Sequence, residues 1–136
     1  MVDELRASEA WLPRLSLVAI IDGHIAGHVV CTRAHVETAP VLALGPIGVD
    51  LSRQNQGVGQ ALMNVVIADA DASGESLIGL VGSPSFYARF GFVPGSDHGI
   101  QSPDPAWGDF FQVKTLSKAH SEIKGRFVYA EPFNRV

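Results

Sequence analysis

The residues with the clearest capacity for chemistry form a polar, glycine-containing turn from Gln54 to Gln60. The turn follows an apolar run and leads into an amphipathic segment, so we expect it to begin a helix. The first N–H groups of a helix have no partner within the helix, and residues 56–60 offer no Ser, Thr or Asp side chain to cap them. Gly57 and Gly59 let another group approach the backbone closely, and the helix dipole adds positive potential there. The turn therefore predicts a site for a phosphate or pyrophosphate.

This turn alone does not identify a ligand. A lone Gly-x-Gly is more often a helix start that binds nothing. Other nucleotide motifs fit less well, because the Gly-x-x-x-x-Gly-Lys-Ser/Thr phosphate loop is absent and the three-glycine dinucleotide fingerprint is incomplete.

A second string, Phe-Tyr-Ala-Arg-Phe-Gly-Phe at residues 86–92, follows the next buried apolar run. With the sequence Gln-Asn-Gln-Gly-Val-Gly of residues 54–59, it resembles the two motifs of the GNAT superfamily of N-acetyltransferases. The first family motif is Gln/Arg-x-x-Gly-x-Gly/Ala, and the second places a tyrosine a few residues before Gly-Phe. Asn55 stands where many members carry glycine, and asparagine tolerates a left-handed backbone well. The string before Tyr87 resembles one branch of predicted N-acetyltransferases, with Ser83 in place of the usual acid.

The resemblance implies acetyl-CoA as cosubstrate. It implies that backbone amides from Gln54 to Gln60 hold the pyrophosphate, and that a bulged strand around Ile47 and Val49 pairs its free backbone groups with pantetheine. The cofactor-binding residues expected from it are Ile47, Val49, Gln54, Asn55, Gln56, Gly57, Val58, Gly59, Gln60, Ser83, Phe86 and Tyr87.

The implied reaction is attack of an amine on the thioester carbonyl. Alkyl amines have pKa values near roughly 10.4, so a base or a water relay is needed near neutral pH. By resemblance and chemistry, Tyr87 is the expected catalytic acid, because a phenol of pKa about 10 stays protonated and can donate to the leaving sulfur. The alternative is a tyrosine that packs between Phe86 and Phe90. The oxyanion is expected to meet a backbone N–H near Ile47 or Gly48.

Several other side chains admit more than one interpretation. His24 and His28, four apart on a strand, are expected to point the same way, but no third ligand is evident and no metal site is predicted. Arg53 either contacts the phosphates or is a solvated charge. The candidate bases, each more simply a solvated loop residue, are Glu37, His35, Asp97 and His98. The aromatic residues that either line an acceptor pocket or pack in the core are Trp107, Phe110, Phe111 and Phe127.

The elements that must position these residues follow from hydrophobic periodicity and turn signals. A helix is expected over 57–73, with Val58, Ala61, Leu62, Val65, Ala68 and Ala72 on its apolar face. Strands are expected at 15–21, 25–32, 41–49 (interrupted by Gly-Pro-Ile-Gly), 76–81, 110–115 and 126–130. A short helix at 84–90 and a loop at 94–108 complete the chain. The fold class is α/β (α+β): a GNAT-like mixed, mostly antiparallel sheet with a splayed parallel strand pair and flanking helices.

Composition bounds the function. The chain has 136 residues, a net charge of −4 and a pI near 5.6, which predicts a single domain and disfavours a nucleic-acid partner. Together with the resemblance, this implies one acetyl-CoA-binding GNAT-like domain over 1–136. No apolar run approaches the ~20 residues that span a membrane, and the N-terminus lacks a secretory pattern. The single cysteine, Cys31, cannot form an internal disulfide. We expect a cytoplasmic protein with no membrane partner.

The front of the chain departs from the family, which usually has a strand and two helices before its first hairpin. Here there is room only for helical turns over residues 4–12. Because those helices often form one wall of the acceptor site, either a partner subunit in a homodimer supplies the wall, or the site is unusually open, or activity is lost. The expected function is acetyl transfer to a primary amine of a small molecule or protein; the alternative is a non-catalytic acyl-CoA-binding or regulatory module.

Overall fold

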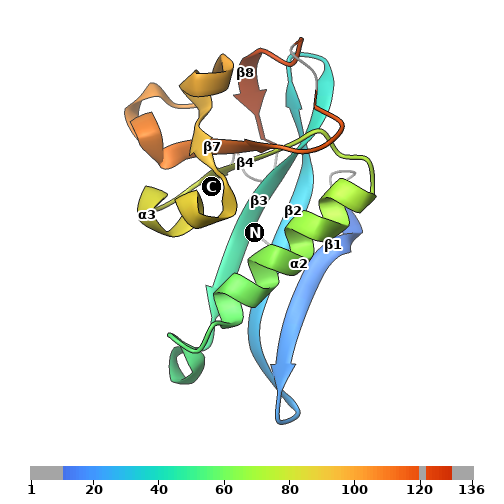
Figure 1. Cartoon of the computed structure of the whole chain (residues 1–136), viewed down its shortest axis with the longest axis vertical. Helices are drawn as coiled ribbons and strands as arrows, with labels where there is room; N and C mark the ends of the chain where they lie inside the picture. The colour runs from blue at the N-terminus through green and yellow to red at the C-terminus, as the bar shows by residue number, and fades with distance from the viewer. Residues whose placement is uncertain (1–10, 120–121, 130–136) are drawn as a thin grey trace.

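The computed structural model describes residues 11–119 and 122–129, with side chains from residue 15 onward. Figure 1 shows long strands crossed by a long helix, with shorter elements gathered beside them. The main elements are β1 (Trp11–Ile21), β2 (His24–Val36), β3 (Ala39–Val49), α2 (Val58–Ala72), β4 (Leu77–Val81), α3 (Pro84–Tyr87), β5 (Val93–Pro94), β6 (Ile100–Gln101), β7 (Phe111–Thr115) and β8 (Gly125–Val128). The 3₁₀ turns are η1 (Leu51–Arg53), η2 (Ala88–Phe90), η3 (Gly95–His98) and η4 (Pro105–Phe110).

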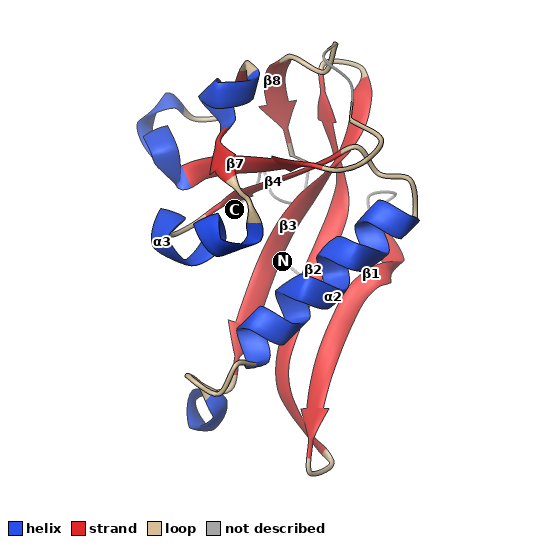
Figure 2. Ribbon diagram, in the orientation of Figure 1, coloured by secondary structure: helices blue, strands red, loops and turns tan. Residues whose placement is uncertain are grey.

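The strands form one eight-stranded sheet in the order β5-β7-β4-β3-β2-β8-β6, with β1 paired to β2. The pairs β3–β4 and β6–β8 are parallel, and the others are antiparallel. Helices flank the sheet (Figure 2). The predicted α+β class, with a mostly antiparallel sheet that contains a parallel strand pair, is therefore confirmed; the two-residue parallel pair β6–β8 was not foreseen.

Two local predictions about the first three strands are confirmed. Asp22 and Gly23, at the β1–β2 turn, have φ angles of 53° and 79°, as a two-residue type I′ hairpin turn requires. Between the pairs Val29–Ile47 and Cys31–Leu44 the register shifts, so two residues of β3 face one residue of β2. This bulge falls within the Gly-Pro-Ile-Gly interruption and turns the end of β3 toward the following helix.

Helix α2 lies across β1, β2 and β3 (Figure 1). It ends before Gly74, whose φ of 82° suits a glycine stop. Only two of the six residues expected on the buried face, Val58 and Leu62, are buried. The buried residues are Val58, Leu62, Met63, Val66 and Ala70, whereas Ala61, Val65, Ala68 and Ala72 are exposed.

Hydrophobic residues cluster on both faces of the sheet. One cluster joins α2 to β1, β2 and β3, and it includes Val29, Leu42 and Met63. The other contains Phe111, Phe127 and neighbours from β2, β3, β4 and β7. Alternate residues of β3 divide between them, since Leu42 belongs to the first cluster and Val41 to the second.

Two further expectations differ from the structure. The helical turns expected at 4–12 are wrong at Trp11 and Leu12, which begin β1; residues 4–10 lie outside the described part. The loop expected at 94–108 contains β6 and two 3₁₀ turns. None of the helices in the described ranges is long and apolar enough to cross a membrane.

Candidate functional site

Unpaired backbone amides mark the start of α2. The first intrahelical bond of this end runs from the Ala61 N–H to the Gly57 carbonyl, at 2.9 Å. The amides of Val58, Gly59 and Gln60 precede that bond, so they have no acceptor within the helix. No side chain caps them. Three N–H donors at the positive end of the helix dipole therefore converge on one point.

The local backbone explains how the chain reaches this arrangement. Asn55 and Gly57 adopt left-handed conformations, with φ angles of 65° and 82°. Glycine reaches such angles without strain, and asparagine does so more easily than most residues. An added Cβ at Gly59 would have only ordinary contacts with Val49 and Phe86. The turn is therefore shaped by its backbone conformation, and its donors stay clear of the protein's own side chains.

The strand that leads to the turn keeps one edge open. Strands β3 and β4 pair through Leu42 with Ile78 and through Ala43 with Gly79. Beyond Ala43, no β4 partner is present within the described residues, although β3 continues to Val49. The two parallel strands thus separate, and the β4-facing backbone groups of residues 44–49 are available to another chain or ligand.

The open edge and the free amides border one cleft of about 700 Å³. Its walls come from the end of β3, the turn, the first turn of α2 and the segment after β4. Of the residues expected to bind the cofactor, those that line it are Ile47, Val49, Gln54, Asn55, Gly57, Val58, Gly59, Gln60 and Phe86. Gln56, Ser83 and Tyr87 do not; Gln56 is exposed, and the Ser83 hydroxyl bonds the Ser85 hydroxyl at 2.9 Å.

Two arginines contribute positive charge to the cleft. The Arg53 guanidinium lies 3.5 Å from the carboxylate of Asp22, which is in the β1–β2 turn. Arg89 lies with its guanidinium carbon 5.1 Å from the centre of the Phe86 ring, a cation–π contact. Arg89 belongs to the second motif, but the sequence alone predicted no role for it. A helical offset of three from Phe86, which places both residues on one side of a short helix, is the signal that could have found it.

Tyr87 is almost fully buried, with 8% of its surface exposed. Its ring meets Phe86 edge-on at 4.9 Å and Phe92 at 6.0 Å. Gly82, directly after β4, lies so close to the ring that an added Cβ would collide with it. The Tyr87 ring thus packs against the segment that directly follows β4. Burial raises the pKa of Tyr87 above its ordinary value, so the hydroxyl keeps its proton near neutral pH.

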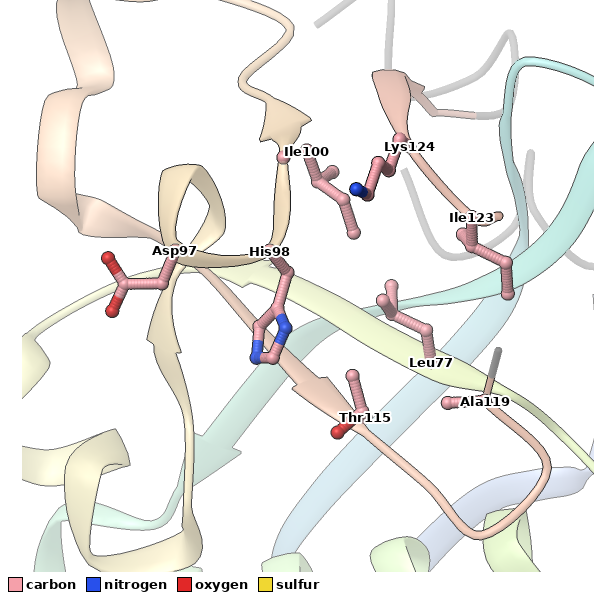
Figure 3. Close-up of a pocket in the computed structure, with 9 residues that line it drawn as sticks. Leu77, Asp97, His98, Ile100, Thr115, Ala119, Ile123 and Lys124 are labelled. Carbon is pink, nitrogen blue, oxygen red and sulfur yellow. The ribbon is translucent and has the colours of Figure 1, made fainter. Parts of the chain in front are cut away.

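None of the four candidate bases lines the cleft. His35 and Glu37 are exposed at the far end of β2, and Glu37 accepts a hydrogen bond from the Arg126 N–H. Asp97 and His98 border a separate cavity of about 310 Å³ beside the first residue of β4 and the last of β7 (Figure 3). The cleft lies past the opposite end of β4, so these side chains are remote from it.

The two hairpin histidines do not point the same way. His24 pairs with Ile21, whereas His28 pairs with Val18. Ile21 packs against the α2 cluster while Val18 is 56% exposed, so the two histidines lie on opposite faces. A register shift in the hairpin reverses the expected alternation. In the described part of the chain, no group of three or more His, Cys, Asp or Glu could hold a metal ion.

The remaining singled-out residues do not line the cleft. Phe111 and Phe127 are buried in the second cluster, Trp107 packs edge-on against Tyr129, and Phe110 is 58% exposed. Cys31 is buried, and burial raises the pKa of its thiol to about 12. A thiol with that pKa carries almost no thiolate at neutral pH and is no nucleophile.

Comparison with known proteins gives consistent results. The model of the acetyltransferase (GNAT) family matches residues 2–92. The uncharacterized N-acetyltransferase YhbS of Escherichia coli K12 is 29% identical over 125 residues, which cover 89% of this chain and 75% of that protein. The uncharacterized N-acetyltransferase YjhQ of the same organism is 31% identical, with 97% of this chain and 77% of that protein covered.

Two solved structures are also similar to this chain. Escherichia coli YhbS in complex with CoA has a TM-score of 0.88 at 27% identity, with 98% of this chain and 76% of that chain covered. A GNAT family acetyltransferase from Brucella melitensis in complex with acetyl-CoA has a TM-score of 0.77 at 28% identity, with 97% and 75% covered.

Proposed function

Because the chain belongs to the acetyltransferase (GNAT) family, whose members are acyltransferases that use acetyl-CoA as cosubstrate, we propose that it transfers acetyl groups from acetyl-CoA directly to a primary amine. One observation carries the proposal: the unpaired amides of Val58, Gly59 and Gln60 open into a cleft whose wall is the free edge of β3. A diphosphate binds to unpaired N–H groups at a helix start, and a chain of amides pairs with a free strand edge.

The binding roles follow from the donors and acceptors present. The amides at the start of α2 bind the pyrophosphate, and Gly57 and Gly59 keep its approach unobstructed. The free backbone groups around Ile47 and Val49 pair with the amides of pantetheine, as an added strand pairs with a sheet edge. This arrangement directs the thioester toward the gap between β3 and β4, where a β3 backbone N–H near Ile47 or Gly48 stabilises the oxyanion.

Tyr87 is proposed as the catalytic acid. When the tetrahedral adduct collapses, the carbon–sulfur bond breaks and the sulfur gains an electron pair. The attacking nitrogen loses its extra proton to solvent, since none of the four candidate bases lines the cleft. The phenol supplies a proton to the sulfur and recovers one from solvent afterwards. Two observations support this role: the ring lies against Gly82, directly after β4, and burial raises the pKa of Tyr87.

Binding and turnover are tested separately. Isothermal titration with acetyl-CoA tests the cleft, and a panel of small amines and peptide amines, read by free-thiol release, tests transfer. Tyr87→Phe should lower kcat by roughly a hundred-fold while leaving the Kd of acetyl-CoA near the parent value. Tyr129→Phe is the matched control, because Tyr129 packs with Trp107 and Phe127 away from the cleft.

Each result has a distinct meaning. Turnover of Tyr87→Phe at the parent rate would remove the acid assignment. Binding of acetyl-CoA without thiol release for any amine would favour the alternative, a non-catalytic acyl-CoA-binding module. No binding at all would contradict the proposed function.

A further inference from the structure

A second cleft of about 450 Å³ runs beside the first. One wall is the outer side of α2, from Asn64 to Asp71, and the other is formed by η2 and β7. Arg89 lines both clefts. On α2, Gln60 borders the first cleft and Asn64, one turn later, borders the second. The two clefts are therefore neighbours along the helix, and Arg89 lines both.

The second cleft carries two cations without ion-pair partners. Within residues 11–119 and 122–129, neither Arg89 nor Lys114 takes part in a salt bridge. The Lys114 ammonium lies over Gly91, at the end of η2, two residues beyond Arg89 in the chain. The Arg89 guanidinium lies over the Phe86 ring, so the two charges line the same cleft from η2 and from β7.

Asp71, the acidic residue that lines this cleft, is already hydrogen-bonded within the protein. Asp71 accepts hydrogen bonds from the Ser117 backbone N–H at 2.9 Å and the Ser117 hydroxyl at 2.6 Å. Those bonds hold the pKa of Asp71 below its ordinary value. Lys114 also lies near enough to Asp71 to lower its pKa. Arg89 and Lys114 against one carboxylate still leave a net positive charge in the lining of this cleft. On the α2 wall of this cleft, Ile67 and Ala68 supply an apolar surface.

We propose that Arg89 and Lys114 bind the 3′-phosphate of the cosubstrate's adenosine, with the base lying along α2 over Ile67 and Ala68. This inference rests on the proposed function, in which the α2 amides hold the pyrophosphate. CoA carries a third phosphate on the ribose next to that pyrophosphate. A dianion at this position requires cations that are not already paired, and a guanidinium and an ammonium form charge-assisted hydrogen bonds with phosphate oxygens. The protein should therefore bind CoA more tightly than the same molecule without its 3′-phosphate.

The test compares CoA with 3′-dephospho-CoA by isothermal titration at fixed salt. The parent protein should bind CoA at least about ten-fold more tightly, because one charge-assisted hydrogen bond accounts for a factor of that size. In Arg89→Ala and Lys114→Ala that ratio should fall toward one, mainly through weaker CoA binding. Arg89→Lys should keep part of the ratio, since it keeps the charge.

Control variants separate this effect from general loss of charge or fold. Lys118→Ala removes an exposed lysine outside the second cleft and should keep the parent ratio. Thermal unfolding of each variant checks that it remains folded. Because both ligands carry the pyrophosphate, a variant that only weakens the first cleft changes both Kd values together and leaves the ratio intact.

The outcomes distinguish this inference from the proposed function. Equal affinity of the parent protein for both ligands would overturn the inference while leaving the function in place. Discrimination that persists in both alanine variants would also overturn it. If neither ligand binds, the proposed function itself fails, and the inference fails with it.

Discussion

Gln60 allows the main-chain donor to be tested apart from its side chain. It is the third residue of α2, where a missing N–H costs the helix no hydrogen bond. Gln60→Ala should leave acetyl-CoA affinity within about three-fold of the parent, whereas Gln60→Pro should weaken it by roughly ten-fold or more because it also removes the amide. Titration calorimetry measures both, and circular dichroism confirms that α2 persists. Equal affinities for the two variants would show that this amide does not bind the cosubstrate.

Cys31 should be chemically silent and should make stability depend on pH. Its thiol pKa is raised from 9.0 to about 12 by burial and by the nearby Glu75 charge, so the native state holds a proton that the unfolded chain loses more readily. The resulting stabilisation is complete below pH 9 and declines as pH rises from 9 to 12. At pH 8, labelling with a disulfide reagent should be slow and should follow the unfolding rate. Fast labelling of the folded protein would disprove the burial.

At the scale of elements, the Arg33–Glu75 pair links the segment after α2 to strands β2 and β3. Arg33 donates two bonds to Glu75, at 2.7 and 2.8 Å, and one to the Val41 carbonyl at 3.0 Å. The two side chains are only 25% and 15% exposed. Glu75→Gln should therefore lower the free energy of unfolding by about 1–3 kcal/mol, as for a hydrogen bond between charged groups, measured by urea denaturation.

The matched control is Asp22→Asn. It removes the exposed pair with Arg53, in which Asp22 is 82% exposed and the separation is 3.5 Å. An exposed pair contributes little, and asparagine accepts the positive φ of this turn, so the change should stay within about 0.5 kcal/mol. A loss in Asp22→Asn as large as that in Glu75→Gln would contradict the ranking of the two pairs by burial.

Sequence patterns predicted the elements with strong local signals. The Asp22-Gly23 turn, the bulge before Ile47 and the start of α2 all follow from turn chemistry and glycine placement. The buried face of α2 did not follow, because apolar residues occur all around this helix. Val65 and Val66 are equivalent by type, and the surface of β1, β2 and β3 determines that Val66 is buried while Val65 is half exposed.

The candidate site was predictable to the same extent. The glycine turn located the amides, because they are a property of consecutive residues. The free edge of β3 was expected from the family resemblance, since it depends on where β3 stops pairing with β4. The placement of Lys114 in the same cleft as Arg89 was not predictable, since β7 brings Lys114 beside η2 only through its antiparallel pairing with β4. The roles of the individual cofactor-binding residues and of Tyr87 stay predictions until the binding and turnover measurements are made.

At the scale of the whole molecule, Gly79 holds the second core cluster against the parallel strands. An added Cβ there would collide with the Phe127 ring, which is fully buried and packs edge-on with Phe111 at 5.2 Å. Gly79→Ala should cost about 1–3 kcal/mol of stability through overpacking, measured by urea denaturation. The same change at Gly59, where an added Cβ makes only ordinary contacts, should be neutral or stabilising because helices favour alanine over glycine. Equal effects at the two positions would contradict the packing argument.

The separation of β3 from β4 has a consequence for the behaviour of the protein in solution. Proteins normally cover or shorten an unpaired strand because it invites pairing with strands from other molecules. Here residues 44–49 have no β4 partner, and under the proposed function their free backbone groups receive pantetheine. Bound cosubstrate would then cover this edge. The protein should therefore aggregate less on heating when acetyl-CoA is present in excess than when it is absent.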